Sequence, residues 1–479
     1  MSDADVLFRP VTELAAQVRS GELSARELVQ ASLDRIEEAN PTLNAFVDVL
    51  AEEALAAADA VGPGDERPFA GVPIAIKNNR AVEGARLTMG ADFTGDFRAP
   101  YDHNTTARLK AAGFVVVGTT TLPEFGLLPT TETKRFGATR NPWDLDRTPG
   151  GSSGGSGAAV AAGLVPIAHA NDGGGSTRIP AACCGLVGLK PQRGRISMAP
   201  EAGEVFLVQD GVLTHTVQET AELLDVLAGP VLGDASWAAP PAEPFAVSAR
   251  RGVDPAFPKL RIAMTTATAT GTPVSDEDVR AAREAAELLA SLGHEVVEDT
   301  PPWNVPGIIE LFTASFGPAV SAQIALFAML NGREPEQEEL EPITRAVYDL
   351  SRSIDAVNGV GAGFQLQGFA RAIVQWTAQY DVLLTPSLAE APLPLGTLQA
   401  FENPIEGFTR SGAFTPYAAM SNITGSPAIS LPLFTREDGL PLGVQLVGQP
   451  GGEGALLALS AQLEAARPWA ARRPAVATA

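Results

Sequence analysis

Residues 169–180 read HANDGGGSTRIP, with three consecutive glycines directly before Ser176. The apolar segment LVPIAHAN at 164–171 leads into the glycines and predicts a buried strand that ends at this turn. Because glycine has no Cβ, the turn can direct several backbone N–H groups toward one developing negative charge, with the serine beside them as a nucleophile. Asp172 and Arg178 flank the turn, where they could pair and hold it. Close packing of strands is the alternative reason for the glycines.

Strand and helix patterns alternate outward from this turn. Short apolar runs predict strands, whereas residues 305–380 have a mainly helical pattern. This order predicts an α/β fold with one large mixed, mostly parallel sheet covered by helices on both faces. A surface connection rich in proline, alanine and glycine is predicted at 229–258, but strands on both sides of it could share one sheet, so we expect a single domain over 1–479. The strands are expected at residues 71–77, 114–120, 164–171, 259–264, 295–299, 381–385, 427–432 and 442–448.

The composition limits the partners that the protein can have. A net charge of −22 over 479 residues argues against nucleic acid and anionic membrane surfaces. No apolar run approaches the roughly 20 residues needed to span a bilayer, and the acidic N-terminus lacks the pattern of a secretory signal, so we expect no membrane partner. Cys183 and Cys184 are neighbours and cannot link distant parts of the chain, which predicts a cytoplasmic protein. Neither HExxH nor CxxC is present, and we expect no metal and no cofactor.

Lys77 closes the segment GVPIAIK at 71–77. The chain contains only five lysines, and this one follows a run whose pattern predicts burial. A desolvated lysine can lose its proton near neutral pH, whereas an arginine stays charged, so Lys77 is a candidate general base. The more common alternative is a lysine whose ammonium group reaches water from the end of a strand.

The segment GGSSGGSG at 150–157 directly precedes an apolar helical pattern rich in alanine. A tight turn at the N-terminus of a helix therefore fits it better than a flexible linker. A phosphate-binding loop would need Lys-Ser or Lys-Thr after its last glycine, and neither is present. The nucleophile pattern G-x-S-x-G occurs at Ser152 and at Ser153, but turn-like residues stand where that pattern requires a strand.

Taken together, three segments resemble the signature of the amidase signature family. They are GVPIAIK at 71–77, PGGSSGGSGAAVAAG at 149–163 and NDGGGSTRIPAACCGLVGLKP at 171–191, in this order. They fall within a core of about residues 70–200, and the C-terminal stretches GSPAISLP and PLGVQLVGQ also look like the family. The resemblance therefore covers nearly the whole chain.

The resemblance implies a Ser-cisSer-Lys triad. Ser176 would be the nucleophile, Ser152 the bridging serine on a cis peptide bond, and Lys77 the base. A proton would pass from the nucleophile through the bridging serine to the uncharged lysine. The implied oxyanion hole consists of the backbone amides of Gly173, Gly174, Gly175 and Ser176.

Further residues are implied to support the triad, and two positions depart from the family pattern. Ser153 would lie behind the site, and Asp172 and Arg178 would form a structural pair. Asn78 stands where the family usually has aspartate, and Thr119 stands where it often has lysine. We expect neither departure to abolish activity.

The motifs predict the reaction more narrowly than the substrate. The resemblance implies amide hydrolysis through an acyl-enzyme. Segments 136–163 and 176–197 look most like those of hydrolases of nylon oligomers and of related amidases that cleave aryl amides and carbamates. We therefore expect a hydrolase of small apolar amides, with aminohexanoate-type oligomers and urethanes as candidates. An amidotransferase A-type subunit is the first alternative, but that branch usually has glutamine where Ile179 stands. A catalytically silent scaffold or binding protein is the second, but all three triad residues are present.

Two variable segments, 122–136 and the helical region at about 305–380, are expected to line the substrate pocket. Core packing is the more common alternative for any single apolar residue in them. The expected partner is a small amide or carbamate, and the resemblance implies a homodimer because such dimers are common in the family. The candidate pocket residues are Phe125, Leu127, Leu128, Phe316 and Phe327.

Overall fold

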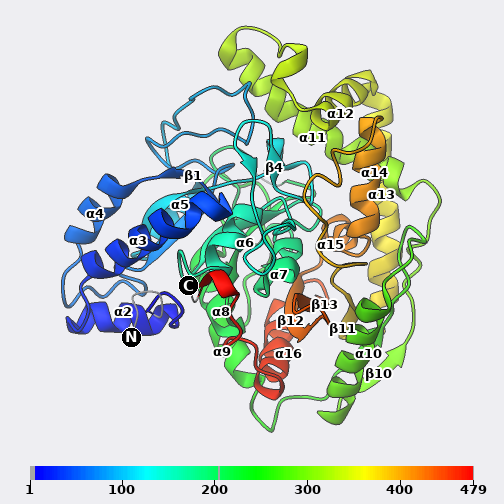
Figure 1. Ribbon diagram of the computed structural model, residues 1–479. Coiled ribbons are helices and arrows are strands. Elements are labelled where there is room, and N and C mark those ends of the chain that lie inside the picture. Colours follow the sequence, from blue (N-terminus) through cyan, green and yellow to red (C-terminus); the bar gives the residue numbers. More distant parts are fainter. Residues whose placement is uncertain (1–5, 203–204, 478–479) are drawn as a thin grey trace.

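The computed structural model describes residues 6–202 and 205–477 (Figure 1). Most of its strands form one 11-stranded sheet, and β4 (Glu132–Thr133) and β5 (Gly137–Ala138) form a separate hairpin. In spatial order, the large sheet consists of β1 (Phe46–Val49), β3 (Val115–Thr120), β2 (Pro73–Lys77), β6 (Ala168–Asp172), β8 (Gln209–Thr214), β7 (Val187–Lys190), β12 (Ala428–Thr435), β13 (Pro441–Gly448), β11 (Val382–Pro386), β9 (Arg261–Met264) and β10 (Glu295–Glu298).

Parallel pairs form most of both wings of the large sheet, and antiparallel pairs form its centre and join the edge strand β1 to β3. On one side β3, β2 and β6 run parallel to one another, and on the other side β11, β9 and β10 do so. Between them β8, β7, β12 and β13 pair antiparallel with their neighbours. Strands from before and after residues 229–258 thus pair in one sheet. The predicted α/β fold with a large mixed sheet is confirmed, although antiparallel pairs outnumber the parallel ones that were expected to predominate.

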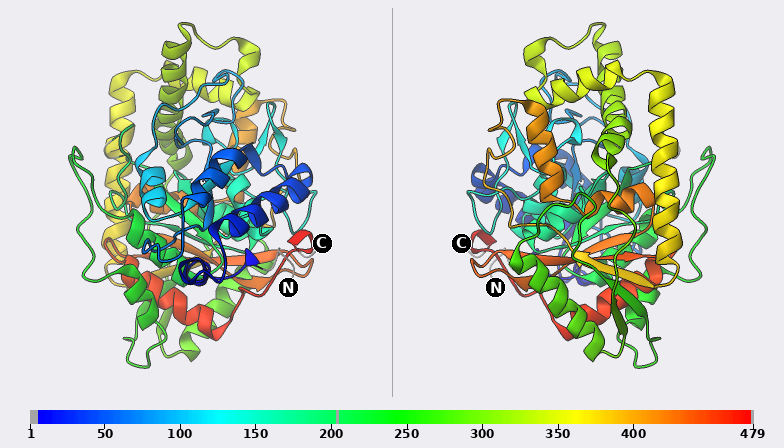
Figure 2. Two further views of the ribbon diagram at one scale, coloured as in Figure 1. Left: turned by 90° about the vertical axis from the view of Figure 1, so that its left-hand side faces the viewer. Right: turned by 90° about the vertical axis from the view of Figure 1, so that its right-hand side faces the viewer.

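Helices cover both faces of this sheet (Figure 2). Helices α6 and α7 pack together on one face, and α8, α9 and α16 pack together on the other. A group formed by α11, α12 and α13 stands to one side with α14 (Figure 1). The helices, including three short 3-10 segments, are α2 (Val11–Ser20), α3 (Ala25–Leu43), α4 (Ala51–Asp59), α5 (Asn104–Ala111), η1 (Glu124–Gly126), α6 (Gly154–Ala161), α7 (Arg178–Cys184), α8 (Val217–Leu227), α9 (Phe245–Arg251), α10 (Asp276–Ser291), α11 (Ile308–Asn331), η2 (Gln337–Glu339), α12 (Pro342–Ser353), α13 (Ala356–Thr377), α14 (Pro404–Phe414), α15 (Ala418–Thr424), α16 (Glu453–Ala466) and η3 (Ala475–Ala477).

The expectation that no apolar run is long enough to span a bilayer is wrong for one helix. Among the described residues, α11 passes that test by length and composition alone, with 24 residues and a mean hydropathy of 1.4 in its most apolar window. A core helix of a globular protein can pass the same test, and 33% of the window is buried. The helix is apolar because one side of it lines the cavities described next.

Candidate active site

The ends of two neighbouring strands bring the predicted catalytic residues together. Lys77 is the last residue of β2, and Asp172 is the last residue of β6 and leads into the turn that carries Ser176. Because β2 and β6 pair in parallel, both segments leave the sheet at the same edge. Ser152 stands in the loop directly before α6, a helix that packs against both strands.

Lys77 is fully buried. Its Nζ lies 2.7 Å from Oγ of Ser152 and 2.7 Å from Oδ1 of Asn171. Burial lowers the pKa of Lys77 well below its ordinary value, and the positive charge of Arg80 lowers it further, against the opposite effect of nearby carboxylates. An uncharged lysine amine can accept a proton, and the contact with the serine gives that proton a direct path.

Ser152 connects the lysine to the cavity in which Ser176 lies. The peptide bond between Gly151 and Ser152 is cis, as the family resemblance implied. Ser152 and Ser176 line the same cavity, and their loops are joined by a hydrogen bond of 3.3 Å from Ser153 N to Ser176 O. The Ser153 hydroxyl donates to the backbone oxygen of Asn171 at 3.3 Å, so it supports the end of β6.

The glycine turn presents three unpaired backbone amides, one fewer than expected. The N–H of Gly175 donates to Oδ1 of Asp172 at 2.7 Å, so its predicted place in the oxyanion hole is wrong. Glycine is still required there, because φ is +127° and a Cβ would lie 2.6 Å from Cβ of Ala418. The other amides of the turn have no protein acceptor within the described residues and belong to residues that line the cavities, namely Gly173, Gly174 and Ser176.

A buried ion pair holds the turn. Arg178 donates to the carboxylate of Asp172 through Nε at 2.9 Å and through Nη2 at 2.8 Å, which confirms the predicted pair. The guanidinium also donates to Oε1 of Gln445 at 2.6 Å, Oδ1 of Asn422 at 2.7 Å and the backbone oxygen of Ala418 at 2.8 Å. Burial alone would raise the pKa of Asp172, but Arg178 and the hydrogen bonds from its neighbours lower it to about 2.

Asn171 is a functional candidate that the sequence analysis missed. Its Oδ1 accepts the hydrogen bond from Lys77, and its Nδ2 donates to Oδ1 of Asn79 at 2.9 Å. A neutral amide in this place orients the lysine amine without adding a charge that would retain its proton. The strand end next to Asp172 was a signal for function, but the lysine partner lies 94 residues away along the chain.

Replacing Asn171 with aspartate should lower kcat/KM at neutral pH by about 10- to 100-fold. The new carboxylate would lie beside Lys77 Nζ, favour the ammonium form and raise the pKa of the lysine. Activity should therefore recover in part as the pH is raised, so the rising limb of the pH–rate profile moves to higher pH. Asn171→Ala is the matched control, since it removes the hydrogen bond without adding a charge. An unchanged rising limb in the aspartate variant would contradict this role.

The two departures from the family pattern contact each other. Nδ2 of Asn78 donates to Oγ1 of Thr119 at 2.9 Å and to the backbone oxygen of Arg86 at 2.7 Å, while its Oδ1 accepts from Thr88 N at 2.8 Å. Two uncharged side chains thus stand where the family usually has aspartate and often has lysine. Neither departure places a new charge next to Lys77, and the effect of both on activity stays a prediction.

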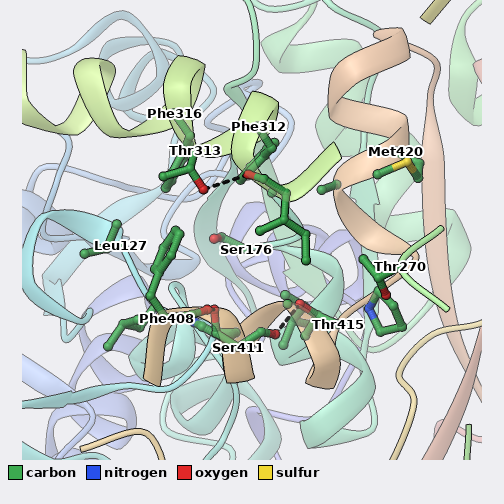
Figure 3. Close-up of a pocket in the computed structure, with 18 of the residues that line it drawn as sticks. Leu127, Ser176, Thr270, Phe312, Thr313, Phe316, Phe408, Ser411, Thr415 and Met420 are labelled. Carbon is green, nitrogen blue, oxygen red and sulfur yellow. Dashed lines mark hydrogen bonds between the residues drawn. The ribbon is translucent and has the colours of Figure 1, made fainter. Parts of the chain in front are cut away.

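Two cavities meet at Ser176. The smaller one, about 110 Å³, is lined by the segment around Leu127 and by α11, α14 and α15 (Figure 3). The larger one, about 560 Å³, also contains Ser152 and Asn171. Phe316 lies between them and lines both.

All five predicted pocket residues line one or both cavities. Leu127 and Leu128 line the smaller cavity, Phe125 and Phe327 the larger one, and Phe316 both. Of the predicted helical region at 305–380, only the part up to Leu330 contributes. Further walls come from α14, α15 and residues near 79–101 and 198–208, and these were not predicted because their apolar patterns do not differ from those of ordinary core segments.

Comparisons with known proteins agree with this geometry. The family Amidase matches residues 27–457. The 6-aminohexanoate-cyclic-dimer hydrolase of Paenarthrobacter ureafaciens is 37% identical over 496 residues, which cover 99% of this chain and 98% of that protein. The structure of a 6-aminohexanoate cyclic dimer hydrolase complexed with substrate matches with a TM-score of 0.92 and 34% identity, over 98% of this chain and 99% of that chain. A bacterial aryl acylamidase matches with a TM-score of 0.86 and 26% identity, over 97% of each chain. The chain therefore belongs to the amidase signature family and is an amidase.

Proposed function

We propose that this amidase cleaves the C–N bond of small apolar amides through an acyl-enzyme on Ser176. The observation that carries the proposal is the distance of 2.7 Å between Lys77 Nζ and Ser152 Oγ, with the lysine buried and its pKa lowered. The uncharged amine takes the proton of Ser152 while Ser152 takes that of Ser176. Oγ of Ser176 attacks the carbonyl carbon, and the oxygen becomes negative beside the three unpaired amides of the turn.

The proton then returns through the same groups. Ser152 delivers it to the leaving nitrogen, the C–N bond breaks and the free amine departs. Water adds to the Ser176 ester, gives up a proton along the same path, and the carboxylic acid leaves as the serine is restored. Lys77 and Ser152 thus act as base in one half of each step and as acid in the other.

Carbamates fit the same chemistry. Breaking the C–N bond of a carbamate releases the amine and leaves an alkyl carbonate on Ser176, which water converts to alcohol and carbon dioxide. The apolar cavities support small apolar amides, and proteins similar to this chain include a hydrolase named for a cyclic aminohexanoate dimer and an aryl acylamidase. We propose aryl amides, aminohexanoate-type oligomers and aryl urethanes as the substrate classes.

Covalent labelling tests the nucleophile directly. A fluorophosphonate probe located by peptide mass spectrometry should label Ser176, and Ser153→Ala should label like the wild type. The same enzyme is assayed for released amine with an aryl acylamide, a cyclic aminohexanoate dimer, an aryl carbamate and a primary amide. A label on Ser152 or Ser153 would overturn the triad, and no released amine from any of the four would overturn the substrate proposal.

A further inference from the structure

The two cavities at Ser176 are separated by aromatic side chains. Phe316 lines both cavities, and Phe312, which lines only the smaller one, stacks on it with ring centroids 5.2 Å apart and planes at 17°. Figure 3 shows both rings above Ser176, between α11 and the nucleophile. This arrangement favours placing the two substituents of an amide carbonyl in different cavities.

The position of the proton donor decides which substituent enters which cavity. Ser152 and Asn171 line the larger cavity and not the smaller one. The leaving nitrogen has to receive its proton from Ser152, so under the proposed function the amine side lies in the larger cavity. The acyl side then lies in the smaller cavity.

The smaller cavity suits a short apolar acyl group. Its volume of about 110 Å³ is below the roughly 150 Å³ of a cavity that holds benzene. Hydroxyl groups that line it already have nearby partners, since Thr313 donates to the oxygen of Ile309 at 2.8 Å and Thr415 to the oxygen of Ser411 at 3.1 Å, and Thr270 is bonded to the hydroxyl of Thr272 at 2.7 Å. The surface that an acyl group would meet is therefore mainly apolar.

The larger cavity has an aromatic wall and one carboxylate with spare acceptor capacity. Among the described lining residues, the charged ones are Arg80 and Glu201. Arg80 is held by Asp210, with Nη2 2.9 Å from Oδ1 and Nε 3.1 Å from both carboxylate oxygens. Glu201 has only long contacts, 3.8 Å to Nη1 of Arg80 and 3.5 Å from the hydroxyl of Tyr101.

The charges around Glu201 favour a cationic ligand. Asp210 neutralises Arg80, so the remaining charge on this side of the cavity is the carboxylate of Glu201. Its side chain is 31% exposed and lines the cavity, and partial burial raises its pKa above the ordinary value. A positive group could approach it without displacing a strong partner.

We propose that Glu201 binds a second amino group at the far end of the leaving amine. This assignment rests on the proposed function and narrows its substrate class to short-chain acyl or alkoxycarbonyl derivatives of diamines. The aromatic side chains of Phe97, Phe125 and Phe327 in the same cavity favour a diamine with an aryl spacer.

Three matched anilides test the proposal. They carry the same acetyl group and differ only at the position para to the amide nitrogen, with aminomethyl, methyl or carboxymethyl. The wild type should favour the aminomethyl anilide over the methyl anilide by about fivefold in kcat/KM, the effect of a partly exposed charge pair. The carboxymethyl anilide should be the poorest of the three.

Glu201→Gln should remove the preference for the aminomethyl anilide, because it should lower kcat/KM for that anilide about fivefold more than for the methyl anilide. Glu298→Gln on β10, at the far edge of the sheet, is the matched control and should retain the preference. Equal kcat/KM for the three anilides in the wild type, or an equal loss on all three in Glu201→Gln, would overturn the role of Glu201. No turnover of any anilide by the wild type would instead overturn the proposed function, and this assignment with it.

The length of the acyl group tests whether the acyl part of the substrate enters the smaller cavity. The acyl group is varied on an anilide with methyl in the para position. The enzyme should cleave the acetyl and butyryl anilides but not the octanoyl anilide. Phe408→Ala, which enlarges the smaller cavity, should admit the octanoyl group and leave the choice among the three anilides unchanged. An octanoyl anilide that the wild type cleaves as well as the acetyl one would overturn the assignment of the cavities.

Discussion

Replacing Lys77 with methionine is expected to lower kcat/KM toward an aryl acylamide by about 10⁴-fold or more. Methionine fills a similar volume but cannot accept the proton of Ser152, 2.7 Å from the lysine nitrogen in the wild type. Because burial lowers the pKa of Lys77, wild-type activity should rise with pH through that lowered pKa. The residual activity of the variant should lack this rise. Steady-state kinetics over about pH 5 to 9 measures both effects.

Lys77→Arg is the matched control for the role of the charge. An arginine stays protonated at all of these pH values, so this variant should be as inactive as the methionine variant. If the lysine acted only as a fixed positive charge, the arginine variant would keep its activity. Circular dichroism and thermal unfolding show whether both variants fold. A folded methionine variant within about tenfold of the wild type would remove Lys77 from the mechanism.

Replacing Arg178 with methionine is expected to destabilise the protein by about 3–5 kcal/mol, the cost of leaving one member of a buried ion pair alone. Asp172 is 1% exposed and would become a buried carboxylate without a cation. Since this carboxylate also accepts the amide of Gly175, the glycine turn should lose its shape and the enzyme its activity. Urea unfolding followed by tryptophan fluorescence measures the loss of stability as a lower midpoint.

The pH dependence separates the ion pair from a simple loss of packing. In the wild type the pKa of Asp172 is about 2, below its ordinary value of 3.8, so its stabilising effect is present at neutral pH and is lost as the pH falls toward about 2. Without Arg178, burial raises the pKa of Asp172, so the difference in stability between wild type and variant should shrink as the pH falls. Adding Asp172→Asn removes the unpaired charge, and the double variant should be more stable than Arg178→Met alone. An equal deficit for both variants at every pH would contradict this account.

Some parts of the site could be predicted because they are short in sequence or are marked by residue type. Asp172 and Arg178 lie six residues apart on one turn, so their pairing is a local matter. The run of glycines predicts a position that only glycine adopts, and one of the three, Gly175, has such a backbone with a φ of +127°. Lys77 ends an apolar run, and such a run predicts a buried segment, so the burial of Lys77 could be expected. The α/β order of the elements follows from the same pattern.

Other parts depend on which distant segments come to lie opposite one another. Asn171 meets Lys77 across 94 residues, and α14 and α15 supply walls of the smaller cavity from about 240 residues beyond Ser176. A hydrophobic pattern shows which side of a segment is buried, but not which segment covers it. The amide of Gly175 was assigned to the oxyanion hole for a local reason, because a run of glycines does not show that the carboxylate of Asp172, three residues away, already accepts one of its amides. The division of the site by Phe316, and the place of Glu201 in one half of it, arise only when the packed chain brings these segments together.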